Sequence, residues 1–278
     1  MEESGRLRPS RIPEHPPRMA SGRRRSTLIG LAVALSLVWS GCGAKKPFAA
    51  RSSEEAFDYA MARYQDDDYP EAISGFQRVI FDYPGDELVD QAMYYLGNSY
   101  FLDEDYLSAA NEFKRVSSEF PDGPYAMPAL YKMGLCYARL SPSHQLDQTD
   151  THRSINAFDT LIKRFPESAY ADSARIQMTQ LQDKLARKEY ESGYYYFKRE
   201  YYDSAIIYFE ILREEYPGSR WMPPTLYFLA EAYEKLELDD DAVEARKDLL
   251  RLFPDSAEAR KVKEEFPALE EEGRASAG

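Results

Sequence analysis

One stretch of the sequence, residues 91–121, constrains what this chain can fold into more than any other. It reads QAMYYLGNSYFLDEDYLSAANEFKRVSSEFP. Its large residues Met93, Leu96 and Tyr100 stand three and four positions apart. Side chains at this spacing share one face of an α-helix, because the helix turns once in about 3.6 residues. The first part of the stretch is therefore predicted to be a helix with one buried stripe.

Small residues in the same stretch make room for a second helix. Gly97 and Ala109 have almost no side chain, so two helices can approach closely there, and Phe113 would fill the space beside the contact. Pro121 cannot continue a helix and would end the second one. This pattern resembles the tetratricopeptide repeat, a helix–turn–helix unit of about 34 residues. Such a unit cannot bury its apolar face alone, so copies should flank it.

An aromatic residue followed by Pro recurs along the chain and marks the copies. The pairs are Tyr83-Pro84, Phe120-Pro121, Phe165-Pro166, Tyr216-Pro217 and Phe253-Pro254. Successive Pro residues are 37, 45, 51 and 37 positions apart, which indicates a 37-residue unit with insertions of 8 and 14 residues. We expect an all-α fold, a right-handed superhelical solenoid of about five helix–turn–helix repeats over residues 53–266. The last residues, 267–278, are expected to be a disordered tail.

Both insertions can be located. The shorter one must lie in the polar run Ser141–Thr151, SPSHQLDQTDT, which is expected to be a loop. The longer one precedes the fourth copy, where residues 170–188 have helical spacing and no helix breaker. Fourteen residues make about four helical turns, so we expect one long helix from about Tyr170 to Lys198.

The beginning of the chain has the features of a secretory signal. Arg23–Arg25 precede an apolar run of 12 residues from Leu28 to Trp39, and small residues follow. The run is too short for a permanent membrane span, which needs about 20 residues. We interpret residues 1–41 as a leader with a lipoprotein signal peptide. The true start is expected at Met19, and a genuine extension before it is the alternative.

The sequence Ser40-Gly41-Cys42 ends this apolar run and resembles a bacterial lipobox, although Trp39 departs from the usual aliphatic residue. In a lipobox the Cys becomes acylated, and several acyl chains on one residue give a stable anchor. Residues 42–52 are then a lipidated tether. Gly43 rather than Asp follows the Cys, which for such lipoproteins implies export to the outer membrane.

No residue pattern indicates catalysis, a metal or a cofactor other than the lipid on Cys42. The sequence lacks a Gly-rich phosphate loop, a His-Glu-x-x-His motif and a Cys-x-x-Cys motif. His144 and His152 flank the polar insertion and are interpreted as solvated. Cys136 is interpreted as an inert buried thiol. The acidic runs Asp66–Asp68 and Asp239–Asp241 are interpreted as helix caps and solvated turn residues. The net charge of −13 argues against nucleic acid as a partner.

Aromatic residues recur at one position of every first helix, which we call the aromatic position. They are Phe57, Tyr94, Tyr131, Tyr190 and Tyr227. Seven residues further on stand Tyr64, Phe101, Ala138, Phe197 and Glu234. First helices line the groove of this repeat, and aromatic rings there suit peptide capture because they offer a large area at a low entropy cost. The alternative is that the rings pack neighbouring repeats together.

A lipobox Cys followed by five such repeats resembles the BamD family, lipoproteins of the machinery that assembles outer-membrane β-barrels. The resemblance covers about residues 42–260 and is strongest over residues 157–219. Its more specific features are the long helix, the run Leu185-Ala186-Arg187-Lys188-Glu189-Tyr190 and the turn Tyr216-Pro217-Gly218-Ser219.

The resemblance implies a scaffold and receptor, lipid-anchored in the outer membrane and facing the periplasm. Its first repeats would bind unfolded outer-membrane proteins through Phe57, Tyr64, Tyr94, Phe101 and Tyr131. Its last repeats would dock on the periplasmic domains of a BamA-like barrel insertase through Arg213, Glu214 and Gly218. The alternative is another periplasmic tetratricopeptide lipoprotein, a cell-division or Tol–Pal adaptor. That family usually has a coiled coil before its repeats, which this sequence lacks.

Overall fold

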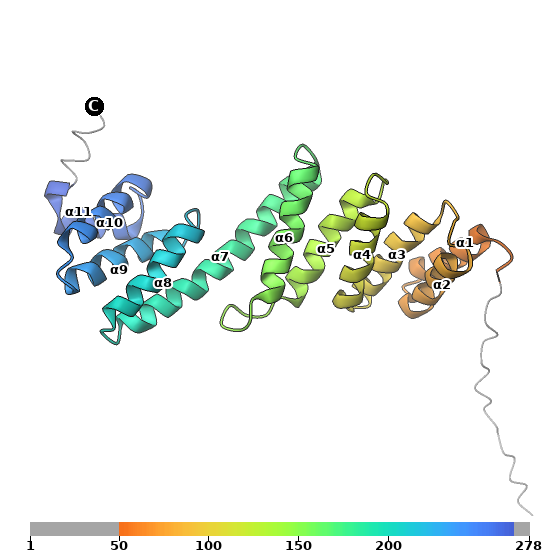
Figure 1. Cartoon of the computed structure of the whole chain (residues 1–278), viewed down its shortest axis with the longest axis horizontal. Helices are drawn as coiled ribbons and strands as arrows, with labels where there is room; N and C mark the ends of the chain where they lie inside the picture. Colours follow the sequence, from red (N-terminus) through yellow and green to blue (C-terminus); the bar gives the residue numbers. More distant parts are fainter. Residues whose placement is uncertain (1–49, 270–278) are drawn as a thin grey trace, which may run out of the picture. The chain divides into compact units, whose positions relative to one another are not determined.

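The computed structural model describes residues 50–269, and within this range the secondary structure is helical with no strand (Figure 1). Apart from a short turn at residues 267–269, the helices are α1 (Ser53–Gln65), α2 (Tyr69–Asp82), α3 (Val89–Leu102), α4 (Tyr106–Glu119), α5 (Ala126–Leu140), α6 (Thr149–Arg164), α7 (Ala169–Phe197), α8 (Tyr202–Glu215), α9 (Met222–Lys235), α10 (Asp239–Leu252) and α11 (Ala257–Glu265). None of these helices is long and apolar enough to cross a membrane.

Helices pack mainly against their neighbours in the chain. Every helix contacts the next one, and α5, α7, α9 and α11 form a further series of contacts between alternate helices. In Figure 1 the pairs α1–α2, α3–α4, α5–α6, α7–α8 and α9–α10 follow one another along the chain. This is the arrangement of a repeat protein, in which each unit contacts only adjacent units. The predicted all-α tetratricopeptide fold is confirmed.

Within the second, third and fourth repeats, a glycine of the first helix receives a phenylalanine ring of the second. A Cβ atom on Gly97 would lie 2.8 Å from the Phe113 ring, and one on Gly193 would lie 2.5 Å from the Phe209 ring. Gly134 stands in the same relation to Phe158. The phenylalanine rings are fully buried, so the glycines are required for this close packing.

The turn between the two helices of a repeat has one conformation in four repeats. Asp67, Glu104, Glu200 and Glu237 occupy equivalent positions and have φ angles of 58°, 64°, 64° and 60°. Residues other than glycine rarely adopt this left-handed conformation. The third repeat has the polar insertion at this place instead, which is why it has no equivalent residue.

The two insertions lie where the sequence predicted. The long helix is confirmed, since α7 runs for 29 residues from Ala169 to Phe197. The connection between α5 and α6 comprises residues 141–148 and is called the insertion loop below. The predicted loop was too long by three residues, because residues 149–151 already belong to α6.

The insertion loop is fastened to α7. His144 Nε2 lies 2.7 Å from a carboxylate oxygen of Glu191. Lys184 Nζ lies 2.5 Å from the Ser141 hydroxyl, and Lys188 Nζ lies 3.3 Å from the backbone oxygen of Leu146. The interpretation of His144 as solvated is therefore wrong, since its side chain is only 13% exposed. His152, in contrast, is exposed on α6.

The fifth repeat replaces the packed phenylalanine by a buried arginine. Arg246 is 4% exposed and forms ion pairs with Glu231, at 3.3 Å, and Glu234. Its guanidinium lies 3.9 Å from the centroid of the Phe266 ring. Asp239–Asp241, predicted as helix-capping and turn residues, form the first turn of α10, where carboxylates are favoured by the helix dipole, and Leu238 has the N-cap position.

The expected leader, Cys42 and most of the tether lie outside the described residues. The same holds for residues 270–278 of the expected tail. Of that tail, residues 267–269 are described and form a helical turn.

Candidate functional site

The rings at the aromatic position pack first against their own repeat. Tyr94 and Phe113 have ring centroids 5.8 Å apart, and Tyr131 and Phe158 are also 5.8 Å apart. The same contact recurs between Tyr190 and Phe209 at 6.3 Å and between Phe57 and Phe76 at 5.6 Å. In these four repeats the ring therefore covers the phenylalanine that lies between the two helices, whereas the fifth repeat has Arg246 at that position.

These rings also reach the following repeat. Tyr94 stacks on Tyr125 at 5.0 Å with an interplanar angle of 28°, and Tyr190 stacks on Trp221 at 5.0 Å with 29°. Tyr131 contacts Tyr170 at 5.4 Å. The three partners share one sequence signal, because each is the fourth residue after the Pro that ends a repeat. This signal was not among the predicted features. Part of each ring packs neighbouring repeats together, as the alternative interpretation of the aromatic position expects.

Tyr95 joins the rings of the first two repeats. Its ring lies 6.3 Å from Phe57, 5.4 Å from Tyr64 and 5.7 Å from Tyr94. Phe57 is only 8% exposed, so this residue belongs to the core and offers little surface to a partner. Tyr95 was not predicted as part of the site, although it directly follows the aromatic position in the sequence.

The fourth and fifth repeats repeat this arrangement around Phe228. Its ring lies 6.4 Å from Tyr190, 5.2 Å from Phe197 and 5.3 Å from Tyr227. Phe228 is equivalent to Tyr95, one residue after the aromatic position. The two ends of the repeat domain therefore have matching aromatic clusters.

The predicted peptide-binding residues that keep a partly exposed ring are Tyr64, Tyr94, Phe101 and Tyr131, which we call the first-half aromatic surface. Lys132 Nζ lies 4.9 Å from the centroid of the Phe101 ring, and burial lowers the pKa of this lysine. Burial also raises the pKa values of Tyr64 and Tyr94, so both phenols stay neutral at physiological pH. The uncharged rings of the first-half aromatic surface therefore suit apolar contact with a polypeptide, and Lys132 adds one cation beside Phe101.

Arg213, a predicted docking residue, is held by carboxylates of two helices. Its guanidinium lies 2.7 Å from Asp248 and 3.2 Å from Glu244 of α10, and 3.2 Å from Glu210 of α8. Burial lowers the pKa of Arg213, but these carboxylates outweigh burial and raise it. Arg213 therefore links α8 to α10 within the chain.

The other two predicted docking residues face outward. Glu214 and Gly218 are exposed, and a Cβ atom on Gly218 would have no neighbour within 4 Å. The turn that holds Gly218 is fixed from α7, where Asp183 Oδ1 accepts hydrogen bonds from Ser219 Oγ at 2.7 Å and Arg220 N at 3.1 Å. Exposed residues on a fixed turn can form a contact surface.

The described part of the chain contains no group of three His, Cys, Asp or Glu residues placed to hold a metal ion. Cys136 is buried, and burial raises the pKa of its thiol to about 12. A neutral buried thiol is unreactive, which confirms the interpretation of Cys136.

The repeat domain of this chain matches one known protein family. Residues 49–249 match the family model YfiO, described as outer membrane lipoprotein. The chain belongs to this family. The matched YfiO region spans the repeats from α1 through most of α10, so family membership rests on the repeat domain itself.

Two curated relatives match this chain over most of their length. The outer membrane protein assembly factor BamD of Caulobacter vibrioides is 27% identical over 228 residues, 81% of this chain and 75% of that protein. The protein of the same name from Rickettsia prowazekii is 27% identical over 236 residues, 82% and 92% of the two chains. The resemblance to the BamD family is confirmed.

Among solved structures, a TPR repeats protein from Bacteroides fragilis is similar, with a TM-score of 0.48 and 13% identity. The match covers 79% of this chain and all of that one.

Proposed function

We propose that this chain is a non-catalytic scaffold and receptor in the assembly of outer-membrane proteins. The observation that carries the proposal is the YfiO match over residues 49–249 together with relatives named as outer membrane protein assembly factors. A stack of helical repeats provides extended surface for binding other proteins, which agrees with a role that makes and breaks no bond. We place the protein in the outer membrane, facing the periplasm and anchored by a lipid on Cys42.

The first-half aromatic surface would receive unfolded outer-membrane proteins. Its partly exposed rings are fixed by contacts such as those of Tyr94 with Phe113 and Tyr125, so little conformational entropy is lost when a peptide binds. Phe57 supports this surface from the core and is not proposed as a contact.

The second half would dock on the periplasmic domains of a barrel insertase. Glu214 and Gly218 supply exposed contacts, while Arg213 holds α8 against α10 and so keeps this surface in shape. A receptor that is tethered beside the insertase raises the local concentration of substrate there, which is sufficient for recruitment.

The substrate role is tested by titrating a C-terminal peptide of a barrel protein against two matched variants. Phe101→Ala should weaken binding at least tenfold. Phe197→Ala is the control, because Phe197 has the equivalent position in the fourth repeat and a similar tyrosine neighbour, at 5.5 Å against 5.3 Å for Phe101. Equal loss of affinity in both variants would contradict capture by the first half.

The docking role is tested by co-purification from solubilised outer membranes. A BamA-like barrel should accompany the wild-type chain and the control Glu167→Arg, whose residue is the first after the Pro of the third repeat. Glu214→Arg should lose most of the barrel. If no barrel accompanies the wild-type chain, the alternative of another periplasmic adaptor replaces this proposal.

A further inference from the structure

The residue that directly follows the aromatic position packs on the preceding repeat, and we call its place the covering position. In the second repeat this residue is Tyr95, whose ring centroid lies 5.4 Å from that of Tyr64. In the fifth repeat it is Phe228, whose ring centroid lies 5.2 Å from that of Phe197. Tyr64 and Phe197 are themselves equivalent, since each stands seven residues after the aromatic position of its own repeat. The covering position thus places a ring over an equivalent ring of the repeat before it.

The third repeat has a lysine at the covering position. Lys132 directly follows Tyr131, and its Nζ atom lies 4.9 Å from the centroid of the Phe101 ring. Phe101 stands seven residues after the aromatic position of the second repeat, so it is the equivalent of the rings that are covered elsewhere. The lysine therefore makes the contact that an aromatic residue makes in the second and fifth repeats. It introduces a cation into the first-half aromatic surface.

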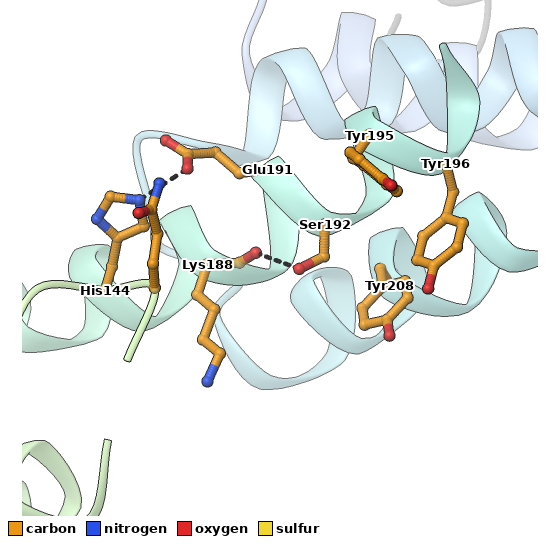
Figure 2. Close-up of a pocket in the computed structure, with 8 residues that line it drawn as sticks. His144, Lys188, Glu191, Ser192, Tyr195, Tyr196 and Tyr208 are labelled. Carbon is orange, nitrogen blue, oxygen red and sulfur yellow. Dashed lines mark hydrogen bonds and ion pairs between the residues drawn. The ribbon is translucent and has the colours of Figure 1, made fainter. Parts of the chain in front are cut away.

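The fourth repeat also has a charged residue at the covering position, and there the charge is paired. This residue is Glu191, which lines the pocket shown in Figure 2. His144 Nε2 and Arg187 Nε each lie 2.7 Å from its carboxylate. In the first repeat the residue is Asp58, which is exposed on α1, the first helix of the described residues.

The ammonium of Lys132 differs from the Glu191 carboxylate because it lacks a polar partner. Among the described residues, no carboxylate, hydroxyl or carbonyl oxygen lies within hydrogen-bonding or ion-pairing distance of its Nζ atom. Burial lowers the pKa of Lys132, as it lowers that of Lys184, but Lys184 Nζ has the Ser141 hydroxyl 2.5 Å away.

A missing partner at a half-buried cation favours an anionic ligand. An ammonium that is partly removed from water without an oxygen partner costs free energy, and contact with one ring offsets only part of that cost. A carboxylate supplied by a ligand would provide the missing partner through a charge-assisted hydrogen bond, which is stronger than a neutral one. Lys132 is therefore a candidate for contact with a carboxylate of a bound polypeptide.

The position of the ammonium indicates which carboxylate fits. A carboxylate that pairs with Lys132 Nζ lies beside the Phe101 ring, since these two groups of the chain are in contact. The last residue of a polypeptide carries its free carboxylate and its side chain on one Cα atom, so it can pair with the lysine and pack on the ring together. An Asp or Glu residue supplies a carboxylate but has no apolar side chain of its own. This place therefore suits a C-terminal residue with a large apolar side chain.

We propose that Lys132 binds the free C-terminal carboxylate of the polypeptide that the first-half aromatic surface receives, while the last side chain of that polypeptide packs on Phe101. This inference rests on the proposed function and adds to it a residue that determines specificity. The surface then distinguishes the end of a polypeptide from an internal segment.

The experiment compares three labelled peptides, titrated by fluorescence anisotropy against the full detergent-solubilised chain. All have the C-terminal sequence of a barrel protein without acidic residues. The first ends in phenylalanine with a free carboxylate, and the second ends in phenylalanine amide. The third is the same amide with Asp as its penultimate residue, so that its carboxylate belongs to a side chain.

Two variants of the chain are compared with wild type. Lys132→Met removes the charge and keeps an unbranched side chain. Lys163→Met is the matched control, because Lys163 lies on α6 with its Nζ atom 2.7 Å from Asp159 and its side chain 74% exposed. Circular dichroism verifies that both variants are folded.

Wild type should bind the free-acid peptide at least about tenfold more tightly than the amide, because a hydrogen bond to a charged group is gained. Lys163→Met should keep this preference, whereas Lys132→Met should bind the acid and the amide within about twofold of each other. The amide that contains Asp should bind wild type like the plain amide. The ratio of the two affinities is compared, because the apolar surface that methionine adds is offered to both peptides.

A preference for the acid that persists in Lys132→Met overturns the proposal, and so does an Asp-containing amide that binds as tightly as the acid. If wild type binds the acid and the amide equally, the proposal for Lys132 is wrong and the proposed function stands. If wild type binds neither peptide, capture by the first half is wrong, and the role of Lys132 is wrong with it.

Discussion

His144 and Glu191 are 47 residues apart in the sequence, and their side chains meet at 2.7 Å. His144 belongs to the insertion loop and Glu191 to the long helix α7, so the two insertions of the repeat pattern are in contact with each other. The 14 additional residues of α7 separate the fourth repeat from the third, and the insertion loop packs against the exposed part of α7.

This contact predicts a pH-dependent loss of stability in Glu191→Gln. Burial alone raises the pKa of Glu191, but hydrogen bonds from His144 and Arg187 outweigh it and hold the pKa below its usual value of about 4.3. A carboxyl group whose pKa is lowered in the folded state stabilises the fold at pH values above its usual pKa, and this contribution disappears as the pH falls through the folded pKa.

Urea unfolding should show Glu191→Gln less stable than wild type by about 0.5–1 kcal/mol at pH 7. The difference should shrink below about pH 4. A difference that stays constant from pH 7 to pH 3 would contradict the role of the charge.

The glycine–phenylalanine contact predicts that Gly134→Ala is destabilising, whereas Gly218→Ala, at a glycine without such a contact, is nearly neutral. In Gly134→Ala the new Cβ atom would overlap the buried Phe158 ring, and such overpacking costs about 1–3 kcal/mol, partly offset by the higher helix propensity of alanine. Gly218→Ala has open space and should change stability by less than about 0.5 kcal/mol. Thermal unfolding measures both. Adding Phe158→Leu should recover part of the loss in Gly134→Ala, and the steric explanation fails if it does not.

The left-handed turn residues predict that one glycine substitution is tolerated and its neighbour is not. Glu104 has a φ of 64°, a conformation that costs a residue with a Cβ atom roughly 1 kcal/mol, so Glu104→Gly should be neutral or stabilising by about 0.5 kcal/mol. Asp103 has a φ of −80°, and Asp103→Gly should lose about 0.5–1 kcal/mol through the entropy of the unfolded chain. Chemical denaturation of both variants compares them directly. A loss in Glu104→Gly as large as that in Asp103→Gly would show that the turn is unstrained.

The repeat spacing predicted the fold because each repeat is stabilised by local contacts. The interval between Pro residues located the insertions, and the lack of a breaker in residues 170–188 predicted α7. Helical periodicity and helix breakers act over a few residues, so they can be read from a single sequence. The end of the insertion loop was placed three residues too late, because the polar residues 149–151 are compatible with either a loop or a first helical turn.

The candidate binding residues could be predicted only in part. The aromatic position was visible in the sequence, but whether its rings face a partner or a neighbouring repeat depends on how the repeats stack. Phe57 is a core residue because Tyr95 of the next repeat covers it. Arg213 forms an ion pair between helices because Asp248 of α10 lies beside it. Both outcomes require contacts between residues more than thirty positions apart, and no local pattern contains this information.

Arg246 predicts a coupled pair of substitutions in the fifth repeat. It takes the place of the packed phenylalanine, and the residue facing that place is Ala230 where three other repeats have glycine. Arg246→Phe alone should therefore lose stability, because the ring would meet the Ala230 Cβ atom and the stacking on Phe266 would be lost.

Overpacking and the lost ion pairs should together cost about 2–4 kcal/mol in Arg246→Phe. Ala230→Gly alone should also be destabilising, by roughly 1 kcal/mol, since it weakens a helix. The double variant should be more stable than the sum of the two single effects by at least about 1 kcal/mol, because the glycine now admits the ring. A double-mutant cycle by urea unfolding measures this coupling. Additive effects would mean that Arg246 is retained for its ion pairs with Glu231 and Glu234 and not for the shape of the space beside Ala230.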